Sequence, residues 1–313
     1  DFPDYADEVA SRPEYRYFRE KRGSFFEGCF PSRYFPQGKS IICATYGLGG
    51  IDYPEKLLRY IGRIYLARCY VPTAASMTGR RVAAMTEFLQ SLGMEVYGNE
   101  VEFPARPAAF EAGIVSYGDN NFVRTEEDGT FVVVYTWLVD RELAYDAHPA
   151  QDHCPEGCTA CMDACPTGAI LSPRRLDPMR CILMCDLSVP MGPGMADLVG
   201  EHNRGCDVCQ TVCPRNHQVL HGPKRRDPFL EEIAERFDLL MLAGFDDPYY
   251  IEVIQPIMYN YIRDVDVFRR NAAIAMGNSG DPAWIPALER ACVAFAGKPS
   301  AKAARWAMEK LSA

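Results

Sequence analysis

The residues best suited to chemistry are cysteines, because nine of the thirteen in this 313-residue chain lie between Cys154 and Cys213. The motif Cys-x2-Cys-x3-Cys-Pro occurs twice, from Cys158 to Pro166 and from Cys206 to Pro214. A cubane [4Fe–4S] cluster needs four thiolates, and in bacterial ferredoxins the cysteine before the proline binds the other cluster of the pair. The spacing therefore predicts two [4Fe–4S] clusters.

That crossing divides the thiols between the clusters. Cluster I would be held by the first three cysteines of the block and by the last: Cys154, Cys158, Cys161 and Cys213. Cluster II would be held by Cys165, Cys206 and Cys209, with a fourth ligand from the pair Cys181 and Cys185. This pair is needed because Asn203 stands where the second motif lacks its leading cysteine. Residues spaced i, i+4 share a helix face; we expect Cys181 to be the ligand and Cys185 the spare.

Zinc and disulfides are the alternative uses of these thiols. Zinc takes four ligands at one tetrahedral site and gives no role to the paired Cys-Pro endings. Disulfide frameworks belong to small secreted domains, whereas this chain is long and its cysteine count is odd. The remaining cysteines are scattered among apolar residues and are expected to be small buried side chains: Cys29, Cys43, Cys69 and Cys292.

Composition limits the class of protein. The chain is 48% apolar and 24% charged, as in ordinary soluble globular proteins. Its net charge of −9 argues against a general binder of nucleic acid, whose affinity rests on neutralising phosphates. No apolar run is long enough to predict a membrane span. Thiols reserved for reduced clusters favour the cytoplasm.

The elements that must position the cysteines begin with an aromatic-rich segment, 1–38, expected to wrap irregularly or as short helices around the next layer. Strands and helices then alternate, which predicts an α/β layer. Strands are expected at Lys39–Tyr46, Met94–Tyr97 and Thr130–Val139, with a turn into another at Gly113–Tyr117. Helices are expected at Pro54–Cys69 and at Ser76–Leu92, the latter closed by Gly93.

The segment from Pro104 to Asn120 holds a short helix that ends at Gly113 and a tight turn at Gly118. Glycines let a backbone approach a large flat ligand closely. A plain helix–turn–strand connection explains the same residues, so the segment alone does not decide between the two interpretations.

The residues after the cysteine block predict helices. The expected helices are Leu230–Ala243, Val267–Met276, Pro282–Phe295 and Lys302–Leu311, with an N-cap at Asp281 before Pro282. The stretch from Arg269 to Pro282 is typical of a helical repeat of the HEAT kind. Since there is little more than one repeat, we expect an appended cap.

With these motifs in place, the chain resembles the epoxyqueuosine reductase family and, more distantly, the respiratory reductive dehalogenases. The resemblance rests on Cys158-Thr-Ala-Cys-Met-Asp-Ala-Cys-Pro-Thr-Gly-Ala-Ile170, on Arg180-Cys-Ile182, on Gly205-Cys-Asp-Val-Cys-Gln-Thr-Val-Cys-Pro-Arg-Asn216, and on the Arg-Arg-Asn-Ala stretch that begins at Arg269. It extends from residue 38 to the end and is most specific in the last half.

The resemblance implies an α+β protein of three parts. These are a nitroreductase-like α/β domain at 1–145 that holds cobalamin without its lower base, a ferredoxin-like domain with two [4Fe–4S] clusters at 146–222, and a helical HEAT-like cap at 223–313. The clusters would feed electrons to the cobalt, and a nearby acid would deliver a proton. The corrinoid-binding residues implied are Arg106, Gly113, Tyr117, Gly118 and Asn120.

The chain departs from the family at the expected acid and at a lysine. The family has an aspartate near Pro104; here Glu102 is the nearest carboxylate and the candidate acid, with Tyr117 as the alternative proton donor. Both could instead be structural, Glu102 as a solvated surface charge and Tyr117 as a core ring. The family's Trp-x-Gly-Lys turn is Ser116-Tyr-Gly-Asp119 here. Specificity for queuosine is therefore not assured.

Partners follow from the same resemblance. A low-potential donor of the ferredoxin or flavodoxin type would supply electrons, and the substrate would be a small molecule or a modified nucleoside. From Val219 to the end, twelve basic residues face thirteen acidic ones, a balance of −1, which disfavours transfer RNA. Two other functions remain open: an electron-transfer protein without substrate chemistry, and a reductase with flavin in place of cobalamin.

Overall fold

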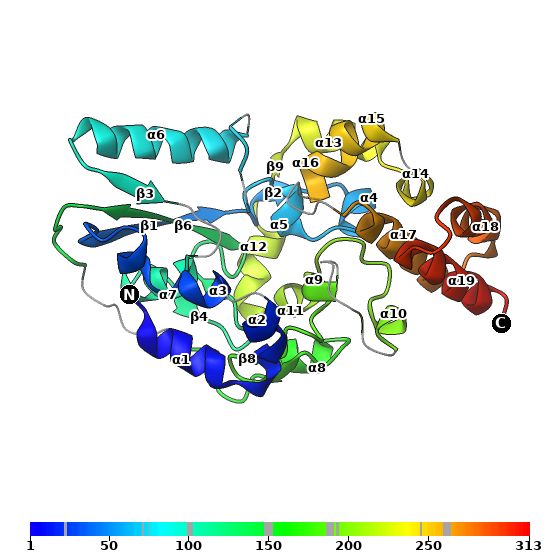
Figure 1. Ribbon diagram of the computed structural model, residues 1–313, viewed down its shortest axis with the longest axis horizontal. Helices are drawn as coiled ribbons and strands as arrows, with labels where there is room; N and C mark the ends of the chain where they lie inside the picture. Colours follow the sequence, from blue (N-terminus) through cyan, green and yellow to red (C-terminus); the bar gives the residue numbers. More distant parts are fainter. Residues whose placement is uncertain are drawn as a thin grey trace.

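The structure is a computed structural model of the chain. It describes residues 1–21, 24–70, 72–74, 76–98, 103–146, 153–185, 191, 194–244, 246–258 and 264–313. Figure 1 shows a sheet with its helices at one end of the molecule, the cysteine-bearing segments near the middle and a group of helices at the other end.

The central sheet has three strands in the order β1 (Ser40–Gly47), β6 (Val132–Val139) and β3 (Val96–Gly98). Both pairs are antiparallel, with Ser40 opposite Val139 in one and Val96 opposite Val139 in the other. Side chains alternate along β6, so Val133, Tyr135 and Trp137 pack with one helix layer while Val132, Val134 and Leu138 pack with the other.

The two helix layers are α6 (Met77–Ser91) on one face of the sheet and α7 (Ala105–Glu111) on the other (Figure 1). Ser76 caps α6 by accepting a hydrogen bond from the amide of Gly79 at 3.0 Å. Beyond α7 lie the N-terminal elements: α1 (Pro3–Ser11), η1 (Pro13–Tyr15), α2 (Arg16–Lys21), α3 (Ser24–Glu27) and η2 (Pro31–Arg33). Short elements complete the layer: β2 (Ile51–Asp52), α4 (Glu55–Leu58), α5 (Arg63–Leu66), β4 (Ser116–Tyr117) and β5 (Val123–Arg124).

The cysteine block folds into short elements joined by loops: α8 (Ala160–Ala164), β7 (Ile170–Ser172), β8 (Arg175–Leu176), α9 (Ile182–Cys185), α10 (Met195–Leu198), α11 (Val208–Thr211), η3 (Pro214–Asn216), α12 (His217–His221) and β9 (Arg225–Arg226). Helices α8 and α11, one from each Cys-Pro motif, pack together. Strand β9 pairs in parallel with β2, which joins the end of this block to the sheet layer.

The C-terminal helices are α13 (Pro228–Arg236), α14 (Leu239–Ala243), α15 (Asp247–Tyr249), the π-helical turn η4 (Tyr250–Ile254), α16 (Gln255–Met258), α17 (Asp266–Asn278), η5 (Pro282–Trp284), α18 (Ile285–Ala294) and α19 (Pro299–Leu311). Helix α19 packs on both α17 and α18. Small residues allow this: a Cβ at Gly277 would lie 2.8 Å from the Cβ of Ala307.

Most predicted elements are confirmed, but two helices are divided. The predicted helix Pro54–Cys69 is α4 and α5, separated where Ile61 bridges to Arg204 and the amide of Gly62 donates to the carbonyl of Arg204. The predicted helix Leu230–Ala243 breaks between α13 and α14, because Asp238 has extended backbone and its side chain caps α14.

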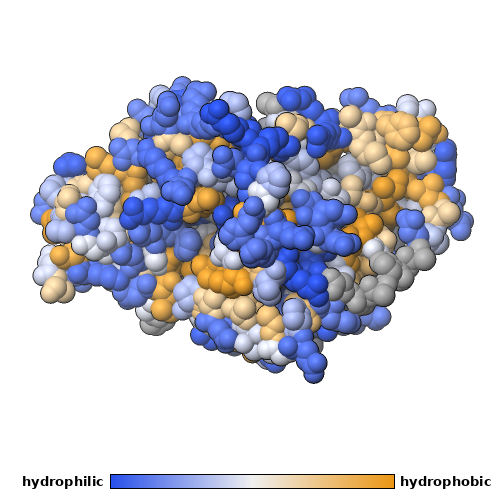
Figure 2. Space-filling model, turned by 180° about the vertical axis from the view of Figure 1, so that it is seen from behind, coloured by the Kyte–Doolittle hydropathy of each residue, from blue (hydrophilic) through white to orange (hydrophobic). Residues whose placement is uncertain are grey.

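The surface seen from behind is mostly hydrophilic, with apolar residues in separate patches (Figure 2). None of the helices that the structure describes combines the length and the apolar character needed to cross a membrane.

Candidate iron–sulfur site

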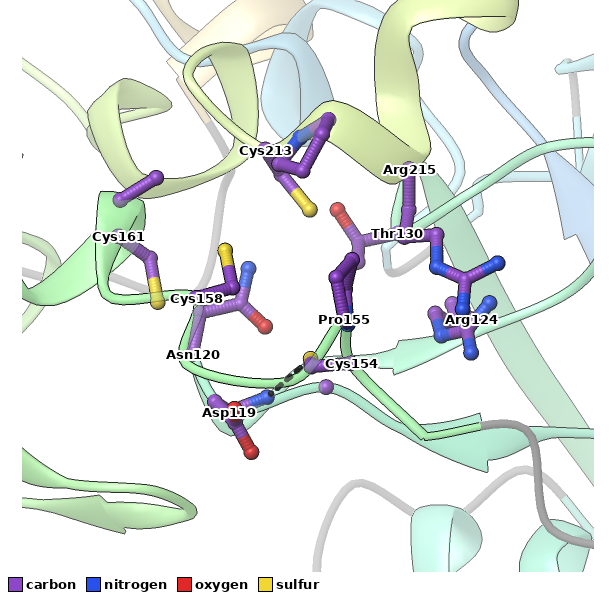
Figure 3. Close-up of a pocket in the computed structure, with 13 residues that line it drawn as sticks. Asp119, Asn120, Arg124, Thr130, Cys154, Pro155, Cys158, Cys161, Cys213 and Arg215 are labelled. Atoms are coloured by element: carbon purple, nitrogen blue, oxygen red, sulfur yellow. Dashed lines mark hydrogen bonds between the residues drawn. The ribbon is translucent and has the colours of Figure 1, made fainter.

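Four cysteines from distant parts of the block line one pocket. Cys154 and Cys158 lie on a loop, Cys161 is in α8, and Cys213 immediately precedes η3. Figure 3 shows their sulfur atoms around a common space, beside the side chain of Asn120. These are the four thiols assigned to cluster I from the spacing, and the structure brings them together.

The loop that carries Cys154 and Cys158 is fixed by local contacts. The amide of Asp119 donates to Cys154 Sγ at 3.3 Å (Figure 3). Gly157 adopts φ +70°, a left-handed conformation that suits glycine. Such N–H···S contacts are among the features that tune a bound cluster.

The second group of thiols lies around Cys209 in α11. Burial raises the pKa of Cys209, and the neighbouring thiols raise it further: Cys206, Cys181, Cys161 and Cys165. Three of these four are the other expected ligands of cluster II. The side chain of Cys185 lies outside the described residues, so Cys181 as ligand and Cys185 as spare stay predictions.

Cys165 has its own hydrogen bonds. Burial works against the thiolate, but the amide of Ala169 at 3.3 Å and the neighbouring Thr167 outweigh it and lower the pKa of Cys165. A thiol whose anion is stabilised in this way is suited to metal ligation, which requires deprotonation.

The first group of thiols suits a cubane cluster in its geometry. The four thiols of the first group line one pocket, and a four-iron cube presents a separate iron to each ligand.

Residues next to the second motif fix it to the rest of the fold. Asn203 and Arg204 are fully buried, and both amides donate to the carbonyl of Tyr60, at 2.8 and 3.1 Å. The carbonyl of Asn203 accepts from Asn271 Nδ2 at 2.8 Å, and Arg204 Nε donates to the carbonyl of Met258 at 3.0 Å. Asn203, which stands where the second motif lacks its leading cysteine, and the adjacent Arg204 therefore connect the motif to α16 and α17 by hydrogen bonds.

Asp207, between Cys206 and Cys209, forms an ion pair with Arg63 of α5. Its Oδ2 accepts from the Arg63 backbone amide and from Arg63 Nη1, both at 2.9 Å, and both side chains are largely buried. The ion pair holds the ligand loop against α5.

The residues predicted to bind a corrinoid fall on two sides of the β4–β5 turn. Gly118 and Asn120 line the cysteine pocket, and Asn120 Nδ2 donates to the carbonyl of Cys209 at 3.4 Å. Arg106 and Tyr117 lie on the α7 side, where Arg106 Nη1 donates to the carbonyl of Asn121 at 2.8 Å. Gly113 ends α7 with φ +75°, as a C-terminal glycine does. Glu102, the candidate acid, lies outside the described residues.

Arg106 and Tyr117 form a half-buried polar centre with Tyr5 and Tyr15 of the N-terminal segment. Burial raises the pKa of Tyr117 to about 12, with Arg106 acting in the opposite direction. Burial also opposes the charge of Arg106, but Tyr5, Tyr117 and Tyr15 raise its pKa. Tyr15 is close enough to Cys181 for its thiolate to act on the pKa of Tyr15, which burial raises.

The sequence did not single out Tyr5 and Tyr15 of the aromatic-rich segment 1–38, nor Arg124 and Arg215. Arg124 is 4% exposed, and both arginines line the cysteine pocket and donate to the carbonyl of His153, at 3.5 and 2.7 Å. Only the aromatic density of the first 38 residues hinted at the tyrosines; no motif pointed to the arginines.

Comparison with known families defines the class first. A family model described as a 4Fe-4S double cluster binding domain matches residues 153–216, and a PBS lyase HEAT-like repeat matches residues 268–293. The chain thus contains a double [4Fe–4S] cluster domain and a HEAT-like repeat, as the motifs predicted. The boundaries 145/146 and 222/223 stay predictions.

Curated relatives give the particular resemblance. The chain is 29% identical to an epoxyqueuosine reductase of Salmonella typhimurium over 72% of this chain and 58% of the relative. It is 27% identical to that of Bacillus subtilis over 83% of this chain and 77% of the relative, and 30% identical to that of Escherichia coli over 74% and 61%. The match thus spans about three-fifths of the Salmonella and Escherichia relatives. The resemblance to epoxyqueuosine reductases, which are oxidoreductases, is confirmed.

Solved structures share the whole fold. An epoxyqueuosine reductase from Bacillus subtilis superposes with a TM-score of 0.72 at 24% identity, covering 99% of this chain and 92% of the other. One from Streptococcus thermophilus gives 0.76 at 20% identity, with coverage of 99% and 89%. A third, solved with an epoxyqueuosine-modified tRNA stem loop, gives 0.70 at 19% identity, with coverage of 100% and 98%. The α+β architecture is confirmed; the nitroreductase-like character of the first layer stays a prediction.

Proposed function

We propose that this chain is an iron–sulfur reductase in which two [4Fe–4S] clusters take electrons from a low-potential donor and pass them to a corrinoid that reduces an organic substrate. The observation that carries the proposal is that Cys213 lines the same pocket as Cys154, Cys158 and Cys161, some fifty residues earlier in the sequence. This exchange of the final cysteine is the arrangement of two-cluster ferredoxins.

Cluster II would be held by Cys165, Cys181, Cys206 and Cys209. The mutual influence of these thiols on the pKa of Cys209 supports this set. Cys161 acts on Cys209 as well, so the two groups of thiols lie close together, as electron transfer between two clusters requires.

The residues on the α7 side fit a corrinoid in part. When bound, this group would supply a strongly reducing cobalt. Arg106 offers a half-buried cation. Burial raises the pKa of Tyr117 to about 12, so Tyr117 keeps its proton at neutral pH and can donate a hydrogen bond or a proton. Gly118 and Asn120 would form the wall between this side and cluster I. Glu102 remains the candidate acid.

The substrate we favour is a small molecule or a modified nucleoside. The relatives are named for reduction of epoxyqueuosine, and one was solved with a modified tRNA stem loop. The balance of −1 from Val219 to the end still disfavours a large RNA partner, since phosphate recognition needs an excess of positive charge.

The test is metal and cofactor analysis of protein isolated without oxygen. We expect about eight iron atoms per chain, four for each cluster, and a change in the visible spectrum when cob(II)alamin is added. Iron without any response to cob(II)alamin would leave an electron-transfer protein, and an extracted flavin spectrum would identify a flavin enzyme. Protein without iron would refute the proposal as a whole.

A further inference from the structure

A second pocket lies away from the cysteines, where the N-terminal end of α6 meets β2 and β9 (Figure 1). Residues from three parts of the sequence contribute to it: Tyr46 with Ile51, Ala67–Arg68 with Ser76–Thr78, and Arg225–Pro228. No residue of this pocket belongs to the proposed cluster or corrinoid sites.

The floor of the pocket is the first turn of α6, a helix of 15 residues. Ser76 caps the amide of Gly79, which leaves the amides of Met77 and Thr78 without a hydrogen bond among the described residues. Free N–H groups and the positive end of the helix dipole make such a turn favourable for an anion.

Thr78 adds an independent observation. Its side chain is 3% exposed and lines the pocket. The nearby hydroxyl of Ser76 donates to the carbonyl of Thr73 and accepts from the amide of Gly79. In the described part of the chain, by contrast, the Thr78 hydroxyl has no hydrogen-bond partner. Because Thr78 lines the pocket and its hydroxyl makes no internal hydrogen bond among the described residues, the hydroxyl is available to a group supplied from outside the chain.

Three arginines give the pocket its charge. Arg68 pairs with Asp227 at 2.6 Å through Nη2, while its Nε is buried and makes no hydrogen bond. Arg226 pairs with Glu231 at 2.7 Å. Arg225 forms no ion pair or hydrogen bond with its side chain among the described residues. Asp227 is the only acidic residue that lines the pocket, against three arginines.

We propose that this pocket binds a phosphate group. Two backbone amides, one hydroxyl and guanidinium groups approach from different segments, and a tetrahedral anion with several oxygens can accept from all of them. The group would belong to free phosphate, a phosphate monoester or a phosphodiester. The site is independent of the clusters, so it goes beyond the proposed function.

The experiment is calorimetric titration of the anaerobically isolated, iron-loaded protein with inorganic phosphate, phenyl phosphate and dimethyl phosphate. Ionic strength is held constant with sodium chloride, since salt screens exposed charges. We expect saturable binding of at least one phosphate in the millimolar range or tighter. Tighter binding of phenyl phosphate than of dimethyl phosphate would assign a monoester, and the reverse order a diester.

Two variants test the residues separately. Thr78→Val removes the hydroxyl and keeps the shape, and Arg225→Gln removes an exposed charge; each should weaken binding about tenfold, as loss of a hydrogen bond to a charged group does. Arg290→Gln, on an exposed arginine of α18, should leave it unchanged. Absence of saturable binding, or equal affinity in all variants, would overturn the proposal.

Discussion

Each motif is proposed to give its final cysteine to the cluster of the other motif, and this can be tested by measuring iron in pairs of variants. The structure groups Cys213 with Cys154 in one pocket, whereas Cys209 lies among the other thiols. Cys213→Ser and Cys154→Ser should therefore each remove one cluster, about four of about eight iron atoms. The double variant should lose no more, because both changes affect the same cluster.

The matched double variant joins Cys213→Ser to Cys209→Ser, which affect different clusters, and should lose all the iron. Cys292→Ser, at a half-buried thiol of α18 outside both groups, should lose none. Iron per chain is measured on soluble protein purified without oxygen, since cluster loss is coupled to folding. The reasoning fails if Cys213→Ser with Cys154→Ser loses all the iron while Cys213→Ser with Cys209→Ser retains half.

Three further results are expected. Asp207→Asn removes the charge that pairs with the largely buried guanidinium of Arg63 but keeps an oxygen that can accept a hydrogen bond, so it should cost about 1–3 kcal/mol, read from loss of cluster absorbance in urea. Asn271→Ala removes the donor to the buried carbonyl of Asn203 and should cost about 1–2 kcal/mol in the same assay. Burial raises the pKa of Cys43 to about 12, so at pH 8 its thiol stays protonated. Iodoacetamide should modify it about a thousandfold more slowly than free cysteine, with the rate rising as pH rises toward that pKa, measured by mass spectrometry. Rapid modification of Cys43 at pH 8 would contradict this.

The sequence predicted a helix or strand accurately where local residue preferences alone determine that element. Strand β6 and helix α6 were expected within two residues of their observed ends, because a run of β-branched residues marks the first and Ser76 with Gly93 marks the second. The Cys-Pro motifs predicted the double-cluster domain for the same reason: the chemistry fixes both residue type and spacing.

Long-range contacts could not be predicted in this way. The residue pattern of Pro54–Cys69 favours one helix, and it is the bridge from Ile61 to Arg204 that divides it. The sequence around Arg106 does not predict that Tyr5 and Tyr15 lie near it; the N-terminal helices bring these tyrosines there. From the sequence, position 203 stood out only because it lacks a cysteine. The hydrogen bonds of Asn203 are to Tyr60 and Asn271, which are far from it in the sequence.

Hydrogen bonds at Asn203 and Arg204 tie the second Cys-Pro motif to the C-terminal helices. Cys206 follows Arg204 by two residues. Just before it, the backbone amides of Asn203 and Arg204 donate to Tyr60, while Met258 and Asn271 of the C-terminal helices are hydrogen-bonded to the same two residues. A gene fragment that ended before the cap would encode every cysteine of the block. It would nevertheless remove the carbonyl of Met258, which accepts from Arg204, and the side-chain amide of Asn271, which donates to the carbonyl of Asn203, close to Cys206 in the sequence.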